Sequence, residues 1–573
     1  MTINFITQKA EGVKMISIRS LLFFIGIAVI CISTGMYFPL LGSTFSPYYG
    51  TIAKNIIITN SWNDLMLSGV DWLDKPHLPF WITAVFFKIF GVGSFGYILP
   101  GFICNLIGAV YTYKISSVWY DKKTSTLSSL LYLTTLHLML SAIDVRAEAY
   151  LLAEIIPAAY YLLQFNLTKR FKYLIIAGFF TGLALMTKGL FVLVTIGGGV
   201  ICLWVYTKQF KNFINYKWWI YVLLSLLVML PEVIALYRQF DLHPTKIIFS
   251  ATHVSGVKWF FWGSQFGRFF NNGPIASSNH TPLHWLFFIH TFLWAFLPWW
   301  PIFFYTVFRS IKNFINNKKH QYSFVFLFGS FIITFLLFSA TSFQVDHYTN
   351  IIFPFACILC AKQIMEFINN NKVPIWILVL QVIFIVLFFV VSFTFNYILF
   401  NKVAFLVLLL MLMFFVGLTV FMWIENKLST LLIFAPISGI LILFITLMCI
   451  NGMIYVKYDI GFNLAKSINK ESGNVQLIGY KIDSMPLKSL ELYSKFPIAY
   501  VDNLDNITKS RSAVIVLPVK YLDILKNKQH KSLVVMKVVS GCEFGVFLNN
   551  LYKLSNIKNQ LDEYVIVRVN YNK

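Results

Sequence analysis

The segment Asp71-Trp72-Leu73-Asp74-Lys75-Pro76-His77-Leu78-Pro79-Phe80-Trp81 brings two carboxylates, an ammonium group and an imidazole together in one short stretch. It comes soon after the first long apolar run of the chain, and its prolines restrict the backbone on both sides of the histidine. Packing alone does not require so many ionisable groups beside an apolar run. The residue types and their spacing therefore predict a segment that binds a charged group.

Acidic residues are few, so each can be considered separately. Residues 1–456 contain 13 of them, and nine are expected in outer loops or in the outer part of a membrane span. Because a carboxylate is costly inside a bilayer and usually faces a cavity or a partner, we expect a polar cavity in the outer half of the protein. The nine are Asp64, Asp71, Asp74, Asp144, Glu148, Glu154, Glu232, Asp241 and Asp346.

The sharpest cluster is Asp144-Val145-Arg146-Ala147-Glu148, at a tight turn that leads into a span. Positions four apart on a helix share a face, so Asp144 and Glu148 are expected to form a carboxylate pair with Arg146 close by. Such a pair either lines a site or takes part in a local salt bridge that caps the helix.

Further candidates for substrate binding lie elsewhere in the chain. Asp346-His347-Tyr348 occupies a comparable turn between two spans, where a simple helix cap is the alternative. Lys188 and Arg268 are basic residues among apolar neighbours and are candidates for phosphate or substrate binding. For Lys188 the alternative is a side chain that snorkels to the membrane surface. The histidines show no convincing metal-ligand spacing, so no cofactor is predicted, and a metal site stays open as an alternative.

Composition indicates which elements must position these residues. The chain of 573 residues is 58% hydrophobic and 12% charged, whereas soluble domains carry about 25% charged residues. Apolar runs of about 20 residues, the length that crosses a bilayer as a helix, recur to about residue 455. We therefore predict an all-α polytopic membrane protein with about 13 transmembrane helices.

The basic residues indicate the orientation. The formal net charge is +23, and clusters of Lys and Arg fall on every second loop between the spans. Since cytoplasmic loops are enriched in Lys and Arg, this alternation puts the N-terminus in the cytoplasm and argues against nucleic acid as a partner. The main outer loops are expected at 39–91 and 238–282.

The last part of the chain has a different character. Residues 457–573 contain short runs typical of strands at 475–480 and 512–517, with a helix-like piece at 487–496 between them. We predict a transmembrane domain at 1–456 and a small α/β domain outside the membrane at 457–573.

Lys75-Pro76-His77-Leu78-Pro79-Phe80-Trp81, followed by Phe90-Gly91-Val92, resembles the Lys-Pro-Pro-Leu-Pro-Tyr-Trp and Phe-Gly-Val block of the bacterial lipid A aminoarabinose transferases. These are relatives of the protein O-mannosyltransferases. The resemblance implies a GT-C type fold with a periplasmic α/β domain, in a multi-pass protein of the bacterial inner membrane. It also implies transfer of one sugar, an amino sugar, from an undecaprenyl-phosphate carrier to a phosphate of lipid A.

The resemblance further implies roles for single residues. Lys75 matches the family lysine that engages phosphate, and Glu148 matches an acidic residue after the second outer loop. Tyr348 matches an aromatic residue at the mouth of the donor cavity. The chemistry accounts for these types, because a departing polyprenyl phosphate develops negative charge that lysine and arginine stabilise.

One residue of the family pattern is missing. Relatives carry a catalytic aspartate on the first outer loop, whereas Gly42-Ser43-Thr44-Phe45-Ser46-Pro47-Tyr48-Tyr49 contains no acid. Asp144 is our candidate for the replacement, because it lies beside Glu148 and Arg146, and Asp74 and Asp346 follow. Asp144 and Glu148 are therefore the predicted catalytic pair.

Other functions stay open at this point. A transferase that uses the same donor class could act on protein or on another glycan. A transporter of lipid-linked sugars would also need an outer cavity, but it predicts internal repeats, and the sequence shows none. The missing aspartate keeps an inactive relative as a further alternative.

Overall fold

The structure is a computed structural model. It describes residues 2–4, 16–40, 46–272, 274–275, 286–316, 321–399, 402–472, 475–482, 487–503, 512–528, 533–541 and 561–570. Contacts within the chain define two units. The helical unit comprises 1–35, 73–79 and 100–446, and the mixed unit comprises 36–72, 80–99 and 447–573. Most of the predicted outer loop 39–91 therefore groups with the C-terminal tail.

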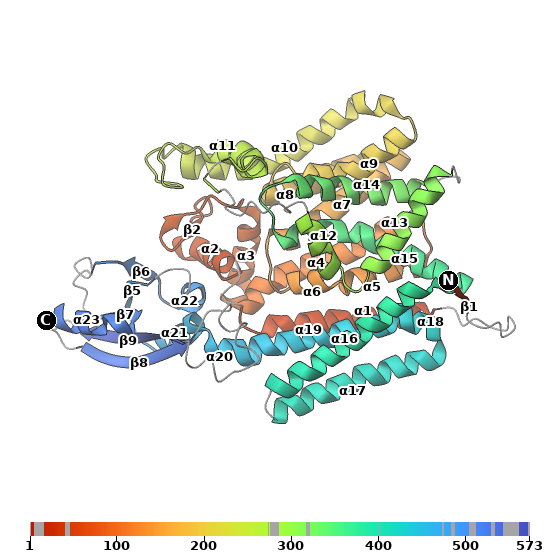
Figure 1. Cartoon of the computed structure of the whole chain (residues 1–573). Helices are drawn as coiled ribbons and strands as arrows, with labels where there is room; N and C mark the ends of the chain where they lie inside the picture. The colour runs from red at the N-terminus through yellow and green to blue at the C-terminus, as the bar shows by residue number, and fades with distance from the viewer. Residues whose placement is uncertain are drawn as a thin grey trace. The chain divides into compact units, whose positions relative to one another are not determined.

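The helical unit is built from apolar helices joined by short turns (Figure 1). Its α-helices are α1 (Ile18–Ser33), α4 (Ser94–Ser116, first turn in the mixed unit), α5 (Lys122–Leu133), α6 (Leu136–Ser141), α7 (Ala147–Thr168), α8 (Phe171–Lys188), α9 (Val192–Tyr206), α10 (Lys217–Leu236), α11 (Gly256–Lys258), α12 (Phe287–Ala295), α13 (Trp300–Ile315), α14 (Tyr322–Ala340), α15 (Phe353–Asn370), α16 (Ile375–Leu399), α17 (Lys402–Glu425), α18 (Lys427–Ser429) and α19 (Ala435–Cys449). π-Helical segments are η3 (Tyr237–Asp241), η4 (Trp259–Gly267) and η7 (Thr430–Phe434), and 3₁₀ segments are η2 (Phe210–Ile214) and η6 (Asp346–Ile352). A short ladder pairs β1 (Thr2–Asn4) with β4 (Lys372–Pro374).

The described residues contain nine helices long and apolar enough to cross a membrane, or ten if the bent pair α12 and α13 forms one span. α7, which carries Glu148 and Glu154, and α9, with 15 residues, lie outside this number. The prediction of an all-α, multi-pass membrane protein is thus confirmed. The predicted number of about 13 helices is higher than this count, which considers only long, strongly apolar helices.

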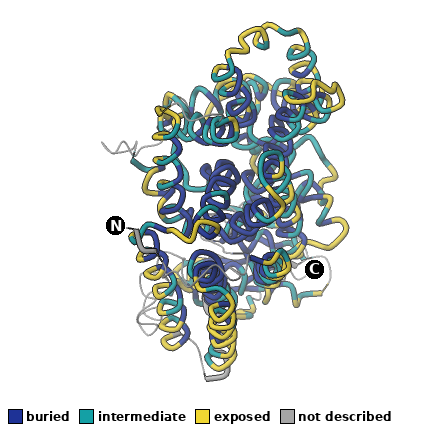
Figure 2. The backbone as a smooth tube through the Cα atoms, turned by 90° about the vertical axis from the view of Figure 1, so that its right-hand side faces the viewer, coloured by how far each residue is buried: buried dark blue, intermediate teal, exposed yellow. Residues whose placement is uncertain are grey.

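Close packing around α7 brings distant parts of the chain together. α7 packs against α8 and α9, and α9 packs against α14. In α9, Gly199 lies against Phe326 and Ser330 of α14, where a larger residue would collide. Buried stretches gather inside the helical bundle, and exposed stretches lie on its outermost helices (Figure 2).

The mixed unit contains a five-stranded sheet in the order β6-β5-β7-β9-β8. β5 is parallel to β6 and β7, whereas β9 is antiparallel to β7 and β8. One face packs on α21 and α22 and the other on α23, so side chains that alternate along β5 are buried on both faces. The predicted α/β character of the tail is confirmed. The bounds are β5 (Gln476–Tyr480), β6 (Ile498–Val501), β7 (Ser512–Pro518), β8 (Leu533–Gly541), β9 (Asp562–Asn570), α20 (Val456–Tyr458), α21 (Ile460–Ile468), α22 (Lys488–Tyr493) and α23 (Leu522–Lys528).

Two segments of the predicted outer loop contact α22 within the mixed unit, α2 (Ser46–Thr59) and the hairpin of β2 (Met66–Leu67) and β3 (Val70–Asp71). Most of α3 (Leu78–Phe90) belongs to the same unit. The hairpin turns at Ser68 and Gly69, both with positive φ, as a type I′ turn requires. Ser68 donates its N–H and hydroxyl to the Glu491 carboxylate, at 3.1 and 2.6 Å. The buried Lys54 ammonium donates to the carbonyl oxygens of Glu491 and Ser494, both at 2.6 Å.

Candidate functional site

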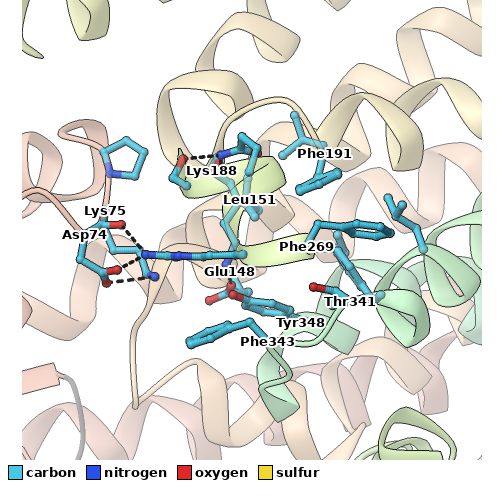
Figure 3. A pocket seen from close by; sticks show the side chains of 18 residues that line it. Asp74, Lys75, Glu148, Leu151, Lys188, Phe191, Phe269, Thr341, Phe343 and Tyr348 are labelled. Carbon is cyan, nitrogen blue, oxygen red and sulfur yellow. Dashed lines mark hydrogen bonds and ion pairs between the residues drawn. The ribbon is translucent and has the colours of Figure 1, made fainter. Parts of the chain in front are cut away.

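A cavity lies within the helical unit, and we call it the charged pocket (Figure 3). Segment 73–79 contributes Asp74 and Lys75, the first turn of α7 contributes Glu148, and the end of α8 contributes Lys188. Arg268, the residue that follows η4, contributes its guanidinium group. The remaining lining residues are Pro76, Leu151, Phe191, Val192, Ser264, Gln265, Phe269, Leu337, Phe338, Thr341, Phe343, Tyr348 and Ile351.

Local sequence explains how these charges reach the pocket. Gly189, with φ of 92°, ends α8 in a conformation that side chains rarely adopt, so Lys188 stands at the last turn. Glu148 lies in the first turn of α7, where the helix dipole favours a negative charge. Pro76 disfavours a helical conformation at Lys75, so segment 73–79 stays outside helix α3.

Oppositely charged groups pair across the pocket. Lys75 Nζ lies 3.1 Å from Asp74 Oδ2, and Arg268 pairs with the same carboxylate. Lys188 pairs with Glu148, and its ammonium lies 4.0 Å from the centre of the Tyr348 ring. All five charged side chains are at least three-quarters buried. Three cations thus face two carboxylates, which leaves a formal net charge of +1.

The pocket also shifts the pKa values of its loop residues. Burial raises the pKa of Asp74, but Lys75 and Arg268 outweigh this effect and hold the pKa at about 2. Burial lowers the pKa of Lys75 to about 8, and the positive charge of Arg268 adds to the lowering. At neutral pH both groups are therefore charged, and the Lys75 ammonium can lose its proton at mildly alkaline pH.

Two buried polar atoms of the pocket have no hydrogen-bond partner among the described residues, Arg268 Nε and Gln265 Oε1. The Gln265 amide is otherwise held in place, since its Nε2 donates to the Lys188 carbonyl at 3.1 Å. An unpartnered buried donor or acceptor costs free energy. In the pocket wall one donor and one acceptor thus lack a partner among the described residues.

The rest of the lining is apolar and aromatic. Phe191 and Phe269 pack with their ring centres 6.0 Å apart, on the side away from Asp74 and Lys75 (Figure 3). Such a combination suits a molecule with an anionic group at one end and a hydrocarbon part at the other.

The other predicted site residues form a polar network beside the pocket. Arg146 donates to Asp144 Oδ2 at 2.7 and 3.0 Å, and its Nη1 donates to His347 Nδ1 at 3.0 Å. His347 Nε2 lies 3.6 Å from Glu148 Oε2, and the His347 backbone N–H donates to Asp346 Oδ1 at 2.8 Å. Lys75, Glu148, Lys188, Arg268 and Tyr348 therefore line the pocket, whereas Asp144, Arg146, Asp346 and His347 lie outside its lining.

The expectation that Asp144 and Glu148 share a helix face is wrong. α7 begins at Ala147, because Arg146 takes an extended conformation as its N-cap, so Asp144 precedes the helix. The local salt bridge weighed as the alternative is present between Asp144 and Arg146. Glu148 takes Lys188 as its partner instead.

Gln265 is not among the predicted site residues, although a glutamine inside an aromatic stretch is a usable signal. The segment Gly42 to Phe45, where the family aspartate is missing, lies outside the described residues, as do 276–282 of the second predicted outer loop. The described residues contain no group of three His, Cys, Asp or Glu that could hold a metal ion.

Comparisons with known proteins agree with the resemblance seen in the sequence. The family described as dolichyl-phosphate-mannose-protein mannosyltransferase matches residues 74–234. The chain is 22% identical over 305 residues to undecaprenyl phosphate-alpha-4-amino-4-deoxy-L-arabinose arabinosyl transferase 2 of Proteus mirabilis, covering 52% of this chain and 51% of that protein. It is also 22% identical over 331 residues to the corresponding Shewanella sediminis protein, covering 56% of each. The chain thus matches about half the length of these curated relatives.

Solved structures show the fold. The crystal structure of ArnT from Cupriavidus metallidurans bound to undecaprenyl phosphate matches with a TM-score of 0.70 at 14% identity, over 96% of this chain and 98% of that one. Its apo structure matches with a TM-score of 0.68. The chain therefore has the fold of that protein, and its sequence is similar to the aminoarabinose transferases and to the mannosyltransferase family.

Proposed function

We propose that the protein is an inner-membrane glycosyltransferase that moves a single amino sugar from an undecaprenyl-phosphate carrier to a phosphate of lipid A at the periplasmic face. The curated relatives are named as undecaprenyl phosphate-aminoarabinose transferases. The observation that carries the proposal for this chain is the charged pocket, which combines a cluster of cations with an aromatic wall.

The charge of the pocket fits the proposed donor. A polyprenyl-phosphate sugar is a phosphodiester with one negative charge, and the pocket has a formal net charge of +1 from its five charged side chains. Binding would therefore neutralise the buried cluster, which reduces the cost of keeping an excess charge away from water. The prenyl chain would leave along the apolar wall.

The same cations serve the proposed transfer step. A phosphate oxygen of lipid A attacks the anomeric carbon, and the bond from that carbon to the donor phosphate oxygen breaks. Undecaprenyl phosphate departs with the bonding electron pair and gains one negative charge, which Lys75, Lys188 and Arg268 stabilise. The attacking oxygen is already anionic, so this step needs no general base.

The pocket carboxylates face the sugar in this proposal. Glu148 and Asp74 would stabilise the positive charge that develops on the sugar ring, and the unpartnered Gln265 Oε1 would accept from the sugar amine. Asp144, also predicted as catalytic, acts in our proposal as a positioning residue. It holds Arg146, which contacts His347, and His347 lies beside Glu148.

Mass spectrometry of lipid A tests the proposal. Lipid A from cells with the intact gene should carry the added sugar mass, and lipid A from a deletion strain should lack it. Lys75→Ala should abolish the added mass at unchanged protein abundance, whereas the control Lys211→Ala, an exposed lysine of η2, should not.

Identical lipid A from the wild-type and deletion strains would contradict the proposal. In that case the same cells show whether a sugar is missing from a protein or from another glycan, the alternative acceptors for this donor class.

A further inference from the structure

Basic residues gather where α7 meets α8 and where α9 is joined to α10, and we call this group the basic end. α9 and α10 are joined at the end of the bundle away from α11 (Figure 1). The last turn of α8, with Lys188, lies at the charged pocket, so the first turn of α8 lies at the opposite end. The basic end comprises Lys169, Arg170, Lys172, Lys208 and Lys217.

The length of α8 sets the distance between the basic end and the charged pocket. α8 has 18 residues, so at about 1.5 Å per residue it is roughly 27 Å long. This length is close to the roughly 30 Å thickness of the hydrocarbon core of a bilayer. α8 is also among the helices that are apolar enough to cross a membrane. The charged pocket and the basic end therefore face opposite leaflets.

The basic end lacks carboxylates that could balance its charge. The sequence from 155 to 231 contains seven Lys or Arg and no Asp or Glu. In the described part of the chain, none of the five side chains of the basic end pairs with a carboxylate. By contrast, Arg309 and Lys362 share the Glu366 carboxylate, at 2.7 and 3.0 Å. Membrane topology explains basic residues in a loop, but it does not require that acidic partners be absent.

A cluster of aromatic rings holds the basic segments together. Trp204, near the end of α9, donates its Nε1–H to Asn166 Oδ1, near the end of α7, at 2.8 Å. The Trp204 ring centre lies 4.7 Å from that of Trp218 on α10 and 5.2 Å from that of Phe213. The Trp218 ring also lies 5.4 Å from Phe165 of α7. Because ring pairs of this kind stabilise packing, the ends of α7, α9 and α10 are held at fixed positions.

This packing brings two lysines close to each other. Burial lowers the pKa of Lys169, and the positive charge of Lys217 lowers it further. Lys169 is also the C-cap of α7, with a left-handed φ of 56°, where glycine or asparagine is usual. Two like charges thus lie near each other, and no carboxylate among the described residues offsets their repulsion. A bound anion would offset it.

Apolar and aromatic side chains surround these cations. Tyr216 and Trp219, on either side of Lys217 in the sequence, are 66% and 73% exposed, and Leu167 and Phe171 are also exposed. Tyr and Trp are enriched at the level of lipid headgroups, and Lys and Arg at that level attract the phosphates of anionic lipids. The surroundings therefore fit an amphiphile with an anionic headgroup better than a soluble anion.

We propose that the basic end binds an anionic phospholipid of the leaflet opposite the charged pocket, with two phosphates in its headgroup, as in diphosphatidylglycerol. One phosphate lies between Lys169 and Lys217, and Arg170 can donate two hydrogen bonds to the other. The acyl chains lie along the exposed apolar residues of α8 and α10. This inference goes beyond the proposed function, because no step of the transfer uses this lipid.

Binding of fluorescently labelled diphosphatidylglycerol to the purified full-length protein, in a non-ionic detergent, tests this assignment. The double variant Lys169→Gln with Lys217→Gln should weaken binding by roughly tenfold or more, because both lysines contact phosphate. The matched control Lys312→Gln with Lys372→Gln changes two exposed lysines elsewhere and should leave the affinity unchanged. Phosphatidylcholine, which has no net charge, should not displace the probe.

Lys217→Glu gives a second readout, because it places a carboxylate beside Lys169. Without added lipid, its thermal unfolding midpoint should lie above that of the wild type, since a repulsion becomes an attraction. Added diphosphatidylglycerol should raise the midpoint of the wild type and should have little effect on the variant. If the lipid raises both midpoints equally, it binds elsewhere and the proposal is wrong.

Undecaprenyl phosphate, which is also an anionic lipid, separates the basic end from the charged pocket. It should not displace the labelled lipid, and Lys75→Ala should leave the affinity for the labelled lipid unchanged. Displacement, together with a loss of binding in Lys75→Ala, would assign the lipid to the charged pocket and overturn the proposal. Equal weakening in the two double variants would also overturn it, because the attraction would then come from the net charge of the protein. These measurements involve no sugar transfer, so they leave the proposed function to its own test.

Discussion

The contact between His77 and Glu232 gives a sharp test of how the charged pocket is held in place. Both side chains are fully buried. The His77 backbone N–H donates to Glu232 Oε2 at 2.9 Å, and His77 Nδ1 lies 3.0 Å from Oε1. Glu232 on α10 thereby fixes the segment that carries Asp74 and Lys75. A proline, which the resembling family block has in place of His77, could not make the first of these bonds because it lacks an N–H.

The structure sets the expected magnitudes. His77→Ala keeps the backbone N–H bond to Glu232 Oε2 but leaves the buried Oε1 without its imidazole partner. This loss should exceed the about 1–3 kcal/mol of a neutral unsatisfied group, because the acceptor is a carboxylate. Glu232→Leu removes the carboxylate itself and takes one acceptor from the His77 N–H, a loss of about 1–3 kcal/mol. The double variant His77→Pro with Glu232→Leu removes the N–H, the ring and the carboxylate together. The stability of this double variant should therefore be close to that of the wild type.

Thermal unfolding midpoints of the purified variants, measured in one detergent at one scan rate, provide the assay. The expected order from lowest to highest is His77→Ala, Glu232→Leu, then the double variant close to the wild type. Undecaprenyl-phosphate-sugar affinity should follow the same order, because Lys75 moves with the segment. If the double variant is as unstable as the sum of His77→Pro and Glu232→Leu measured singly, the two residues are not coupled and the reasoning is refuted.

Two further predictions follow from the buried lysines. Donor affinity should be full below pH 8 and should fall as pH rises through the Lys75 pKa of about 8, since a phosphodiester keeps its single charge over this range while Lys75 loses its proton. Binding titrations from pH 6.5 to 9.5 measure this, and Lys75→Arg should flatten the profile; a slope that persists in Lys75→Arg would exclude Lys75 as its source. In the mixed unit, Lys54→Met removes the donor to two carbonyl oxygens of the tail. Each unsatisfied carbonyl should cost about 1–3 kcal/mol of stability, so α2 should be cleaved faster in limited proteolysis. Unchanged cleavage rates would show that this contact does not hold α2 in place.

The sequence was informative about which residues matter, and the reason is physical. A basic side chain inside an apolar run must reach a cavity, a partner or the membrane surface, so Lys188 and Arg268 were recognisable without a structure. Both line the charged pocket together with Lys75, Glu148 and Tyr348. The short apolar runs at 475–480 and 512–517, separated by a helix-like piece, likewise predicted the sheet of the tail. Strands that are buried on both faces need apolar side chains at successive positions.

The sequence could not predict which charged side chains pair, because the partners are far apart along the chain. Glu148 pairs with Lys188 forty residues away, and Arg268 pairs with Asp74 across 194 residues. Local spacing favoured Asp144 as the companion of Glu148, but the helix begins too late for the two to share a face. Helix starts depend on one residue's conformation, here the extended Arg146, which no composition rule fixes.

The carboxylates of the charged pocket have a role even before any ligand binds. Without Asp74 and Glu148, three buried cations would repel one another, and Lys75 already has a lowered pKa. The pairs therefore keep the cations charged and oriented while the pocket is empty. When a phosphodiester enters, it competes for the same ammonium and guanidinium groups, so the two carboxylates become less tightly held as the donor binds. In the free protein Asp74 and Glu148 thus hold the cations in place. The same two carboxylates are positioned to face the sugar, whose ring gains positive charge as the donor phosphate departs. A pocket lined only by cations could hold the phosphate, but it would offer nothing to the opposite charge that forms one bond away.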